Sequence, residues 1–271
     1  MPTKYTEVKG YATYYHYCGA TTLPDVVPDL SRGRKIVLVH GAGGNGHRWH
    51  RQVDALGASH SPVALDLPGH GRSSGVEGLM SVPDYADFVV AFLDALKVGS
   101  AVIAGWSMGG AIAMDLALRY PARVEALVLV ATAAKFNVAK DRIDALRAVT
   151  MGRAPQAFTT DGYSPRTLKE NFDVVREGWM EQIKTDPRVR YTDMLACSQV
   201  DLRESIAKID KPTVIFAGAD DQGTTVADAE LIKSKIRGAK LKVVADAGHM
   251  IPSERPGELN GAIEQFLSEL R

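Results

Sequence analysis

The chain has 271 residues, 45% of them hydrophobic, so it is long enough to bury a sizeable core. Its 32 lysines and arginines balance 32 aspartates and glutamates, which removes the usual electrostatic reason to expect a nucleic acid or an anionic membrane as a partner. Residues 1–10 lack the apolar core of a secretory signal, no apolar run approaches the ~20 residues that span a bilayer, and the two cysteines match no disulfide framework or metal spacing. We therefore expect a cytoplasmic protein without a metal or another cofactor.

The first third of the chain alternates strand-like and helix-like segments. Residues 3–9 and 12–18 alternate in polarity, which predicts an antiparallel hairpin at the edge of a sheet. The turn-rich residues 19–34, which include Pro24, are expected to form an exposed loop. Four further segments show the periodicity of buried strands or amphipathic helices: strands at 36–39 and 63–67, helices at 48–56 and 83–97.

An apolar run that opens at Ala101 turns at once into a helix-forming stretch, with Gly105-Trp106-Ser107-Met108-Gly109 between them. So sharp a corner forces its tip residue into a strained backbone conformation, at a cost of roughly 1–3 kcal/mol. Glycines at the two flanking positions let the strand and the helix approach where a Cβ would collide. The pattern predicts that the Ser107 hydroxyl is held above the end of the sheet; the alternative is a structural turn with an idle serine.

After this corner the chain returns to strands at 126–131, 213–218 and 241–245 and ends in a helix at 256–270. Between the first two of these strands, residues 135–208 contain no convincing strand. Helical stretches fill this segment: 141–149, 165–185 and 193–206. We interpret 135–208 as a helical cap inserted into a mostly parallel sheet with helices on both faces, although ordinary packing helices would give the same pattern.

Ser107 needs a base if it is to act as a nucleophile, and histidine is the usual one because it exchanges a proton near neutrality. Among seven histidines, His249 follows a predicted strand, and loops at the carboxyl ends of strands are where ligands meet an open α/β sheet. We expect His40 to brace the neighbouring glycine loop and His70 to be structural. His47 and His50 follow the glycine loop. We expect them either to line the mouth of the active-site cleft or to be solvent-exposed at the start of a helix.

The base in turn needs an acid that fixes its tautomer. The strand at 213–218 is followed by Asp220 and Asp221, and the residues alone allow either one; the other then only forms a turn. A developing oxyanion needs two backbone N–H groups, one from Met108 at the helix N-terminus and one from the loop 41–44. That loop lacks the spacing and the Lys-Ser/Thr ending of a phosphate cradle.

Four motifs in this order resemble the α/β-hydrolase superfamily, over nearly the whole chain. Gly105–Gly110 resembles its nucleophile elbow, His40–Gly44 its oxyanion loop, and Gly248-His249 its catalytic histidine loop. The stretch 66–73, Asp-Leu-Pro-Gly-His-Gly-Arg-Ser, resembles a turn of the esterase, lactonase, cofactor-free haloperoxidase and C–C hydrolase branch. The resemblance implies an eight-stranded α/β-hydrolase core at 1–134 and 209–271.

Position by position, the resemblance implies Ser107 as nucleophile, His249 as base and Asp221, rather than Asp220, as acid. It implies the Ala42 N–H as the second oxyanion donor beside Met108. One position departs from the family pattern, because Thr225 stands where a proline is common four residues beyond the acid.

The resulting hypothesis is a serine hydrolase that cleaves a small carboxylic ester through an acyl-enzyme intermediate. A lactonase, a perhydrolase or a C–C bond hydrolase of the same fold is the alternative, and a non-catalytic small-molecule receptor is a further one. Trp106 and Met250 stand where C–C hydrolases often have asparagine and an aromatic residue, which counts against that activity. Trp106 and Trp179 are the candidate substrate contacts, and other apolar cap residues would line the pocket or simply pack.

Overall fold

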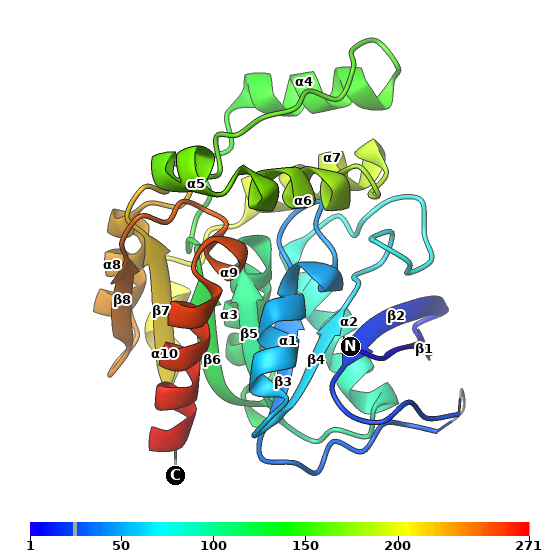
Figure 1. Ribbon diagram of the computed structural model, residues 1–271, viewed down its shortest axis with the longest axis vertical. Helices are drawn as coiled ribbons and strands as arrows, with labels where there is room; N and C mark the ends of the chain where they lie inside the picture. Colours follow the sequence, from blue (N-terminus) through cyan, green and yellow to red (C-terminus); the bar gives the residue numbers. More distant parts are fainter. Residues whose placement is uncertain (24–25, 271) are drawn as a thin grey trace.

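The computed structural model describes residues 1–23 and 26–270 and forms one eight-stranded sheet flanked by helices (Figure 1). The strand order is β1-β2-β4-β3-β5-β6-β7-β8. The pairs β1–β2 and β2–β4 are antiparallel, and every other pair is parallel. The strands are β1 Thr3–Val8, β2 Tyr11–Tyr17, β3 Lys35–Val39, β4 Ser61–Leu65, β5 Ala101–Trp106, β6 Val124–Val130, β7 Thr213–Gly218 and β8 Lys240–Val244. The predicted fold class is confirmed.

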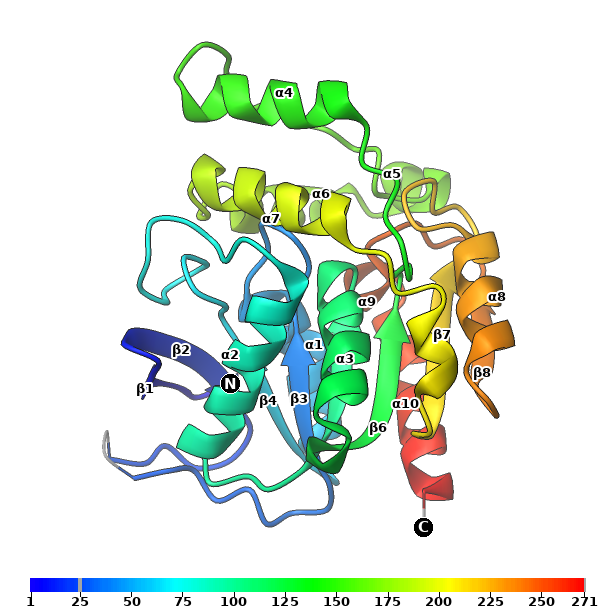
Figure 2. The same cartoon turned by 180° about the vertical axis from the view of Figure 1, so that it is seen from behind.

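Helices cover both faces of the sheet because its central strands are apolar on both sides. In β3, for example, Val37 and Val39 pack into one core while Ile36 and Leu38 pack into the other. Figures 1 and 2 show opposite faces of the sheet. One face carries α1 (His50–Leu56), α9 (Ile251–Glu254) and α10 (Pro256–Glu269), and the other carries α2 (Val82–Ala95), α3 (Met108–Arg119) and α8 (Val226–Lys235).

Most element boundaries agree with the sequence to within a few residues. The described part of the predicted loop 19–34 contains neither helix nor strand, and Pro24 lies outside the described residues. Short 3₁₀ turns lie at Gly46–Trp49, Pro121–Arg123 and Ser205–Lys208. In the part of the chain that the structure describes, no helix has the length and apolarity needed to cross a bilayer.

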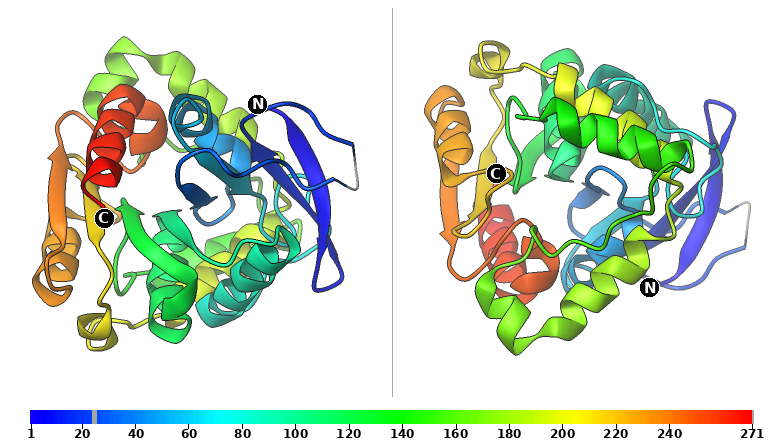
Figure 3. Two further views of the ribbon diagram at one scale, coloured as in Figure 1. Left: turned by 90° about the horizontal axis from the view of Figure 1, so that it is seen from below. Right: turned by 90° about the horizontal axis from the view of Figure 1, so that it is seen from above.

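Four helices lie between β6 and β7 and cross the carboxyl edge of the sheet (Figure 3, right). They are α4 Lys140–Thr150, α5 Pro165–Glu170, α6 Phe172–Gln182 and α7 Pro187–Gln199. The predicted stretch 165–185 is broken at Asn171, which has non-helical backbone angles. The helix predicted at 193–206 overlaps α7 only at 193–199: α7 begins six residues earlier, where the Asp186 side chain caps its start, and ends at Gln199.

Candidate active site

The strand-to-helix corner between β5 and α3 presents Ser107 at its tip. Ser107 has a φ of 56° and a ψ of −120°, a conformation that L-residues rarely adopt. A Cβ at Gly105 would overlap the Gly109 carbonyl, and a Cβ at Gly109 would overlap the Val39 carbonyl of β3. The two glycines therefore allow the close approach that this corner requires.

Neighbouring strand β6 holds the strained corner in place. The Ser107 N–H donates to the Val130 carbonyl over 3.0 Å, and the Thr132 hydroxyl donates to the Ser107 carbonyl over 2.7 Å. With its backbone fixed on both sides, Ser107 has only its side chain left to move.

His249 lies in the loop that follows β8, and its Nε2 is 3.0 Å from the Ser107 Oγ. The buried Glu254 carboxylate accepts hydrogen bonds from the flanking N–H groups of Gly248 (2.9 Å) and Met250 (3.2 Å). The His249 N–H itself donates to the Gly162 carbonyl over 2.8 Å, in the segment between α4 and α5. The imidazole is thus aimed at the hydroxyl by contacts from both the core and segment 135–208.

Asp221, in the loop after β7, lies against the other side of the imidazole. Its Oδ2 is 2.8 Å from the His249 Nδ1, and it also accepts from the Thr224 hydroxyl (2.7 Å). Burial alone would raise the pKa of the Asp221 carboxyl, but the hydrogen bonds and charge of His249 and the hydrogen bonds of Thr224 bring it below its usual value. Asp221 therefore stays ionised beside the imidazole, while Asp220 uses its N–H to bond the Ala247 carbonyl.

The loop after β3 contacts the serine corner directly. A Cβ built on Gly41 would lie 2.9 Å from the Ser107 Cβ, so this loop borders the hydroxyl. In the described part of the chain, the amides of Ala42 and Met108 donate to no other protein group. His40 supports the loop as expected: its ring nitrogens bond the Gly41 carbonyl and the Leu67 N–H, and burial lowers its pKa to about 3, which keeps it neutral.

The two tryptophans proposed as substrate contacts occupy different environments. The Trp106 indole N–H donates to the His249 carbonyl over 2.8 Å, and the Arg48 guanidinium lies 5.5 Å from the indole centroid. Trp179 on α6 packs edge-on against Phe158, with ring centroids 5.2 Å apart. Trp106 thus braces the histidine loop, and contact of either ring with substrate stays a prediction.

A fully buried carboxylate from α7 joins the glycine loop to the core. Asp193 accepts from the Gly43 N–H (2.7 Å), the His70 Nε2 (2.7 Å) and the Tyr85 hydroxyl. Burial alone would raise the pKa of Asp193 and lower that of His70. The opposite charges of the two groups and the hydrogen bond between them outweigh burial, so the pKa of Asp193 is lowered and that of His70 is raised, as in an ion pair.

Three residues of this neighbourhood were missed from the sequence: Thr224, Glu254 and Asp193. The spacing Asp-x-x-Thr before a helix could have indicated Thr224 as a partner of Asp221. Asp193 carries no local signal, because its partners come from distant parts of the chain. Glu254 bonds the nearby Gly248 and Met250 as well as the distant Ser164, but no sequence spacing points to these contacts.

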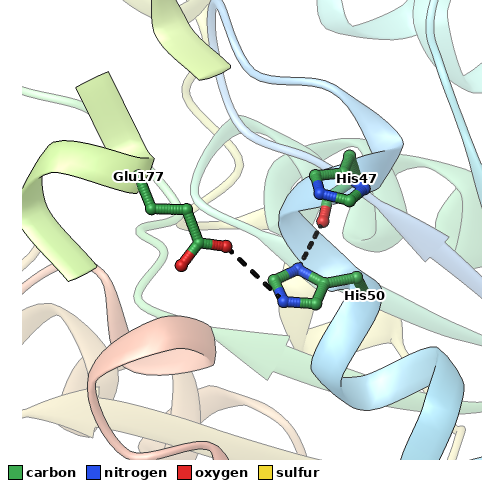
Figure 4. A group of neighbouring side chains, drawn as sticks. All are labelled: His47, His50 and Glu177. Atoms are coloured by element: carbon green, nitrogen blue, oxygen red, sulfur yellow. Dashed lines mark hydrogen bonds and ion pairs between the residues drawn. The ribbon is translucent and has the colours of Figure 1, made fainter. Parts of the chain in front are cut away.

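A second polar cluster joins α1 to α6 (Figure 4). The His50 Nδ1 bonds the His47 carbonyl over 2.9 Å, and its Nε2 lies 3.5 Å from a Glu177 carboxylate oxygen. One potential ligand atom from each of these three residues lies within 4.8 Å of the others, the one grouping of potential metal ligands found among the described residues. Since Arg51 already binds both Glu177 oxygens, at 3.3 and 2.7 Å, we interpret the cluster as an ion-paired contact between core and segment 135–208.

Comparison with known proteins identifies the family to which this chain belongs. A profile of the Alpha/beta hydrolase family matches residues 36–262. The match covers most of the chain and includes the serine corner and the histidine loop. The chain belongs to the α/β-hydrolase family, and its general class is hydrolase.

Individual relatives include esterases and lactonases. The pimeloyl-acyl-carrier-protein methyl ester esterase of Neisseria meningitidis is 30% identical over 240 residues, covering 84% of this chain and 88% of the relative. The 3-oxoadipate enol-lactonase 2 of Acinetobacter baylyi is 26% identical over 235 residues, covering 86% and 88%. The solved structure of an enol-lactonase from Burkholderia xenovorans superposes with a TM-score of 0.83 at 26% identity, covering 98% of this chain and all of that one (100%).

Proposed function

We propose that the protein is a serine hydrolase that cleaves a small carboxylic ester through an acyl-enzyme intermediate. The observation that carries this proposal is the chain of contacts from the Ser107 Oγ to the His249 Nε2 (3.0 Å) and from the His249 Nδ1 to the Asp221 Oδ2 (2.8 Å). In that arrangement the carboxylate holds the proton on Nδ1, so that Nε2 is free to accept the hydroxyl proton.

In the proposed reaction, Ser107 attacks the ester carbonyl while His249 takes the hydroxyl proton. The carbonyl oxygen becomes negative and accepts hydrogen bonds from the Ala42 and Met108 amides, of which each is worth roughly 3–4 kcal/mol in the transition state. His249 then returns the proton to the leaving alcohol. Water, deprotonated by the same imidazole, releases the acid from the acyl-enzyme and restores the serine.

The proposed division of labour assigns catalysis to a core formed by 1–134 and 209–271 and substrate selection to a cap formed by 135–208. The helices of this segment cross the edge of the sheet where Ser107 lies, which supports the assignment. Trp106 and Trp179 are the proposed substrate contacts, and the expected cytoplasmic location stays a prediction.

A lactonase is the second candidate function, since enol-lactonases are among the relatives of the chain. A lactone is a cyclic ester, so the same three side chains and two amides would open it with the acyl and alcohol parts still joined. A panel of linear short-chain esters and lactones of matched size separates the two activities by their kcat/KM values.

The test of the nucleophile is labelling with a fluorophosphonate, read by intact mass and peptide mapping. We expect one adduct on Ser107 in the folded wild-type protein, no adduct in Ser107→Ala, and a loss of esterase activity of roughly 10⁵-fold or more in that variant. Folded wild-type protein that is neither labelled nor active on any ester would instead support the receptor alternative.

A further inference from the structure

Arg190 lies on the glycine loop that borders the serine. It belongs to α7, and a Cβ built on Gly43 would lie 3.0 Å from the Arg190 Cγ and 3.3 Å from its Cδ. The same helix reaches the same glycine through Asp193, which accepts the Gly43 N–H. Since Gly41, two residues earlier, contacts Ser107, the aliphatic stem of Arg190 runs beside the proposed oxyanion site.

The guanidinium of Arg190 has no counter-ion on its own helix. Two carboxylates stand at helical neighbour positions, Asp186 four residues before it and Asp193 three residues after it. Asp186 is bound by the Arg188 guanidinium over 2.7 Å and 3.0 Å. Both oxygens of Asp193 are occupied by Gly43, His70 and Tyr85. Throughout residues 1–23 and 26–270, no ion pair or side-chain hydrogen bond involves Arg190.

In the surroundings of Arg190, a guanidinium without a counter-ion destabilises the folded protein. The side chain is half-buried, and the charged group that acts on it is a second cation, Arg142 of α4. Burial and then repulsion from Arg142 lower the pKa of the Arg190 guanidinium. An unpaired charge partly removed from water destabilises the folded protein unless a ligand supplies the opposite charge.

We propose that Arg190 binds a carboxylate of the substrate, so that the preferred substrates are esters that carry a free carboxylate. This inference rests on the proposed ester hydrolysis and adds the substrate class to it. A guanidinium matches a carboxylate with two parallel hydrogen bonds, and the stem of Arg190 lies against Gly43 in the loop that borders Ser107. Arg142 adds a second positive charge in the neighbourhood of Arg190.

The experiment compares two ethyl esters with six-carbon acyl chains, monoethyl adipate and ethyl hexanoate, by ethanol release. They differ in a terminal carboxylate against a methyl group. We expect the wild-type protein to prefer monoethyl adipate in kcat/KM by roughly tenfold to a hundredfold, the value of a charge-assisted hydrogen bond. A second pair of esters places the carboxylate in the alcohol part: the acetate ester of 4-hydroxybutanoate is compared with butyl acetate. The two comparisons together show whether Arg190 binds a carboxylate in the acyl part or in the alcohol part of the ester.

In Arg190→Gln we expect the preference between the paired esters to collapse, mainly through a higher KM for the charged ester, and Arg190→Lys should retain part of it. The matched control is Arg188→Gln, an exposed arginine of the same helix turn that is paired with Asp186; it should leave the preference and both rates unchanged. Thermal unfolding of each variant verifies that it is folded.

Two results would overturn the inference: a wild-type protein with no preference for either charged ester, or a Gln variant that slows the charged and uncharged esters by the same factor. Both leave ester hydrolysis itself intact. If no ester is turned over and Ser107 is not labelled, the proposed function fails. Calorimetric binding of adipate to the wild-type protein and to Arg190→Gln then decides the role of Arg190 separately, and equal affinities would reject it.

Discussion

At the scale of single residues, the environment of Asp221 distinguishes it from the acid beside it in the chain. Its carboxylate accepts hydrogen bonds from the Gly223 and Thr224 amides (2.8 and 3.0 Å) and from the Thr224 hydroxyl, as well as from His249. These donors leave one orientation for the carboxylate, with Oδ2 directed at the His249 Nδ1. Thr224 lies 3.2 Å from the same nitrogen and completes the support of the ring.

The first prediction concerns the charge of this carboxylate. In Asp221→Asn the amide fits the same space but no longer fixes the histidine tautomer or stabilises the imidazolium, so we expect kcat to fall by roughly 10³- to 10⁴-fold with little change in KM. Steady-state kinetics on a short-chain ester measure it. Asp220→Asn is the control and should retain wild-type kinetics; comparable losses in both variants would contradict the assignment of Asp221.

At the scale of elements, α7 both covers the edge of the sheet and holds the glycine loop in position. It begins at the Asp186 cap and carries Asp193 in its second turn, where the carboxylate bonds Gly43 of the glycine loop as well as His70 and Tyr85. The position of the loop that offers the Ala42 amide therefore depends on a helix that lies about 150 residues further along the chain.

The second prediction tests this dependence. Asp193→Asn removes a buried charge from its ion pair with His70, so we expect the free energy of unfolding to fall by roughly 3–5 kcal/mol, as measured in urea. The Gly43 N–H also loses a charged acceptor, and kcat should fall by about tenfold as the oxyanion loop loosens.

The control for this prediction is Asp186→Asn on the same helix. Asparagine caps a helix start as well as aspartate does, so stability should change by no more than about 0.5 kcal/mol. A wild-type kcat in the folded Asp193→Asn protein would show that the glycine loop is positioned without α7.

At the scale of the whole molecule, buried histidines make stability depend on pH. His16 of β2 is buried and its Nδ1 has no partner among the described residues. Burial, followed by the charges of His47, the N-terminus and Arg72, lowers its pKa to about 4, against an opposing effect of Glu181. Between pH 6.5 and 4 the unfolded chain therefore binds a proton that the folded chain excludes, and this residue costs stability as the pH falls.

The third prediction isolates that contribution with His16→Phe, which retains the aromatic contacts with Tyr14 and His47. At pH 7.5 the variant and the wild type should differ little in the pH-dependent part of their stability. At pH 4.5 the free energy of unfolding of the variant should have risen by about 2–3 kcal/mol relative to that of the wild type, since each pH unit below 6.5 costs the wild type about 1.4 kcal/mol. Urea unfolding at both pH values measures the difference, and a pH-independent difference would show that His16 titrates normally.

Much of the fold and of the candidate site could be predicted because both depend on local patterns. Alternating polarity predicted the first two strands and apolar runs the other six, to within a few residues. Residues that follow strand ends, such as His249, meet at one edge in any parallel sheet. The choice of Asp221 required the family resemblance, since Asp220 satisfied the same local pattern. The start of α7 has a local signal that our prediction did not use, namely Asp186 at the cap followed by Pro187. The role of Asp193 could not be predicted, because a charged residue inside a helix is expected to be solvent-exposed until its distant partners are known.

Hydrogen bonds from segment 135–208 hold both the glycine loop and the histidine loop beneath it. The segment's Asp193 holds Gly43, its Gly162 carbonyl holds the His249 amide, and its Ser164 amide bonds the Glu254 carboxylate over 2.8 Å. A chimaera that exchanged this segment for the equivalent one of a relative would therefore disturb the oxyanion loop and the histidine loop together with the choice of substrate. New specificities in this scaffold are more readily engineered by changing individual side chains under the helices than by transplanting the helices as a block.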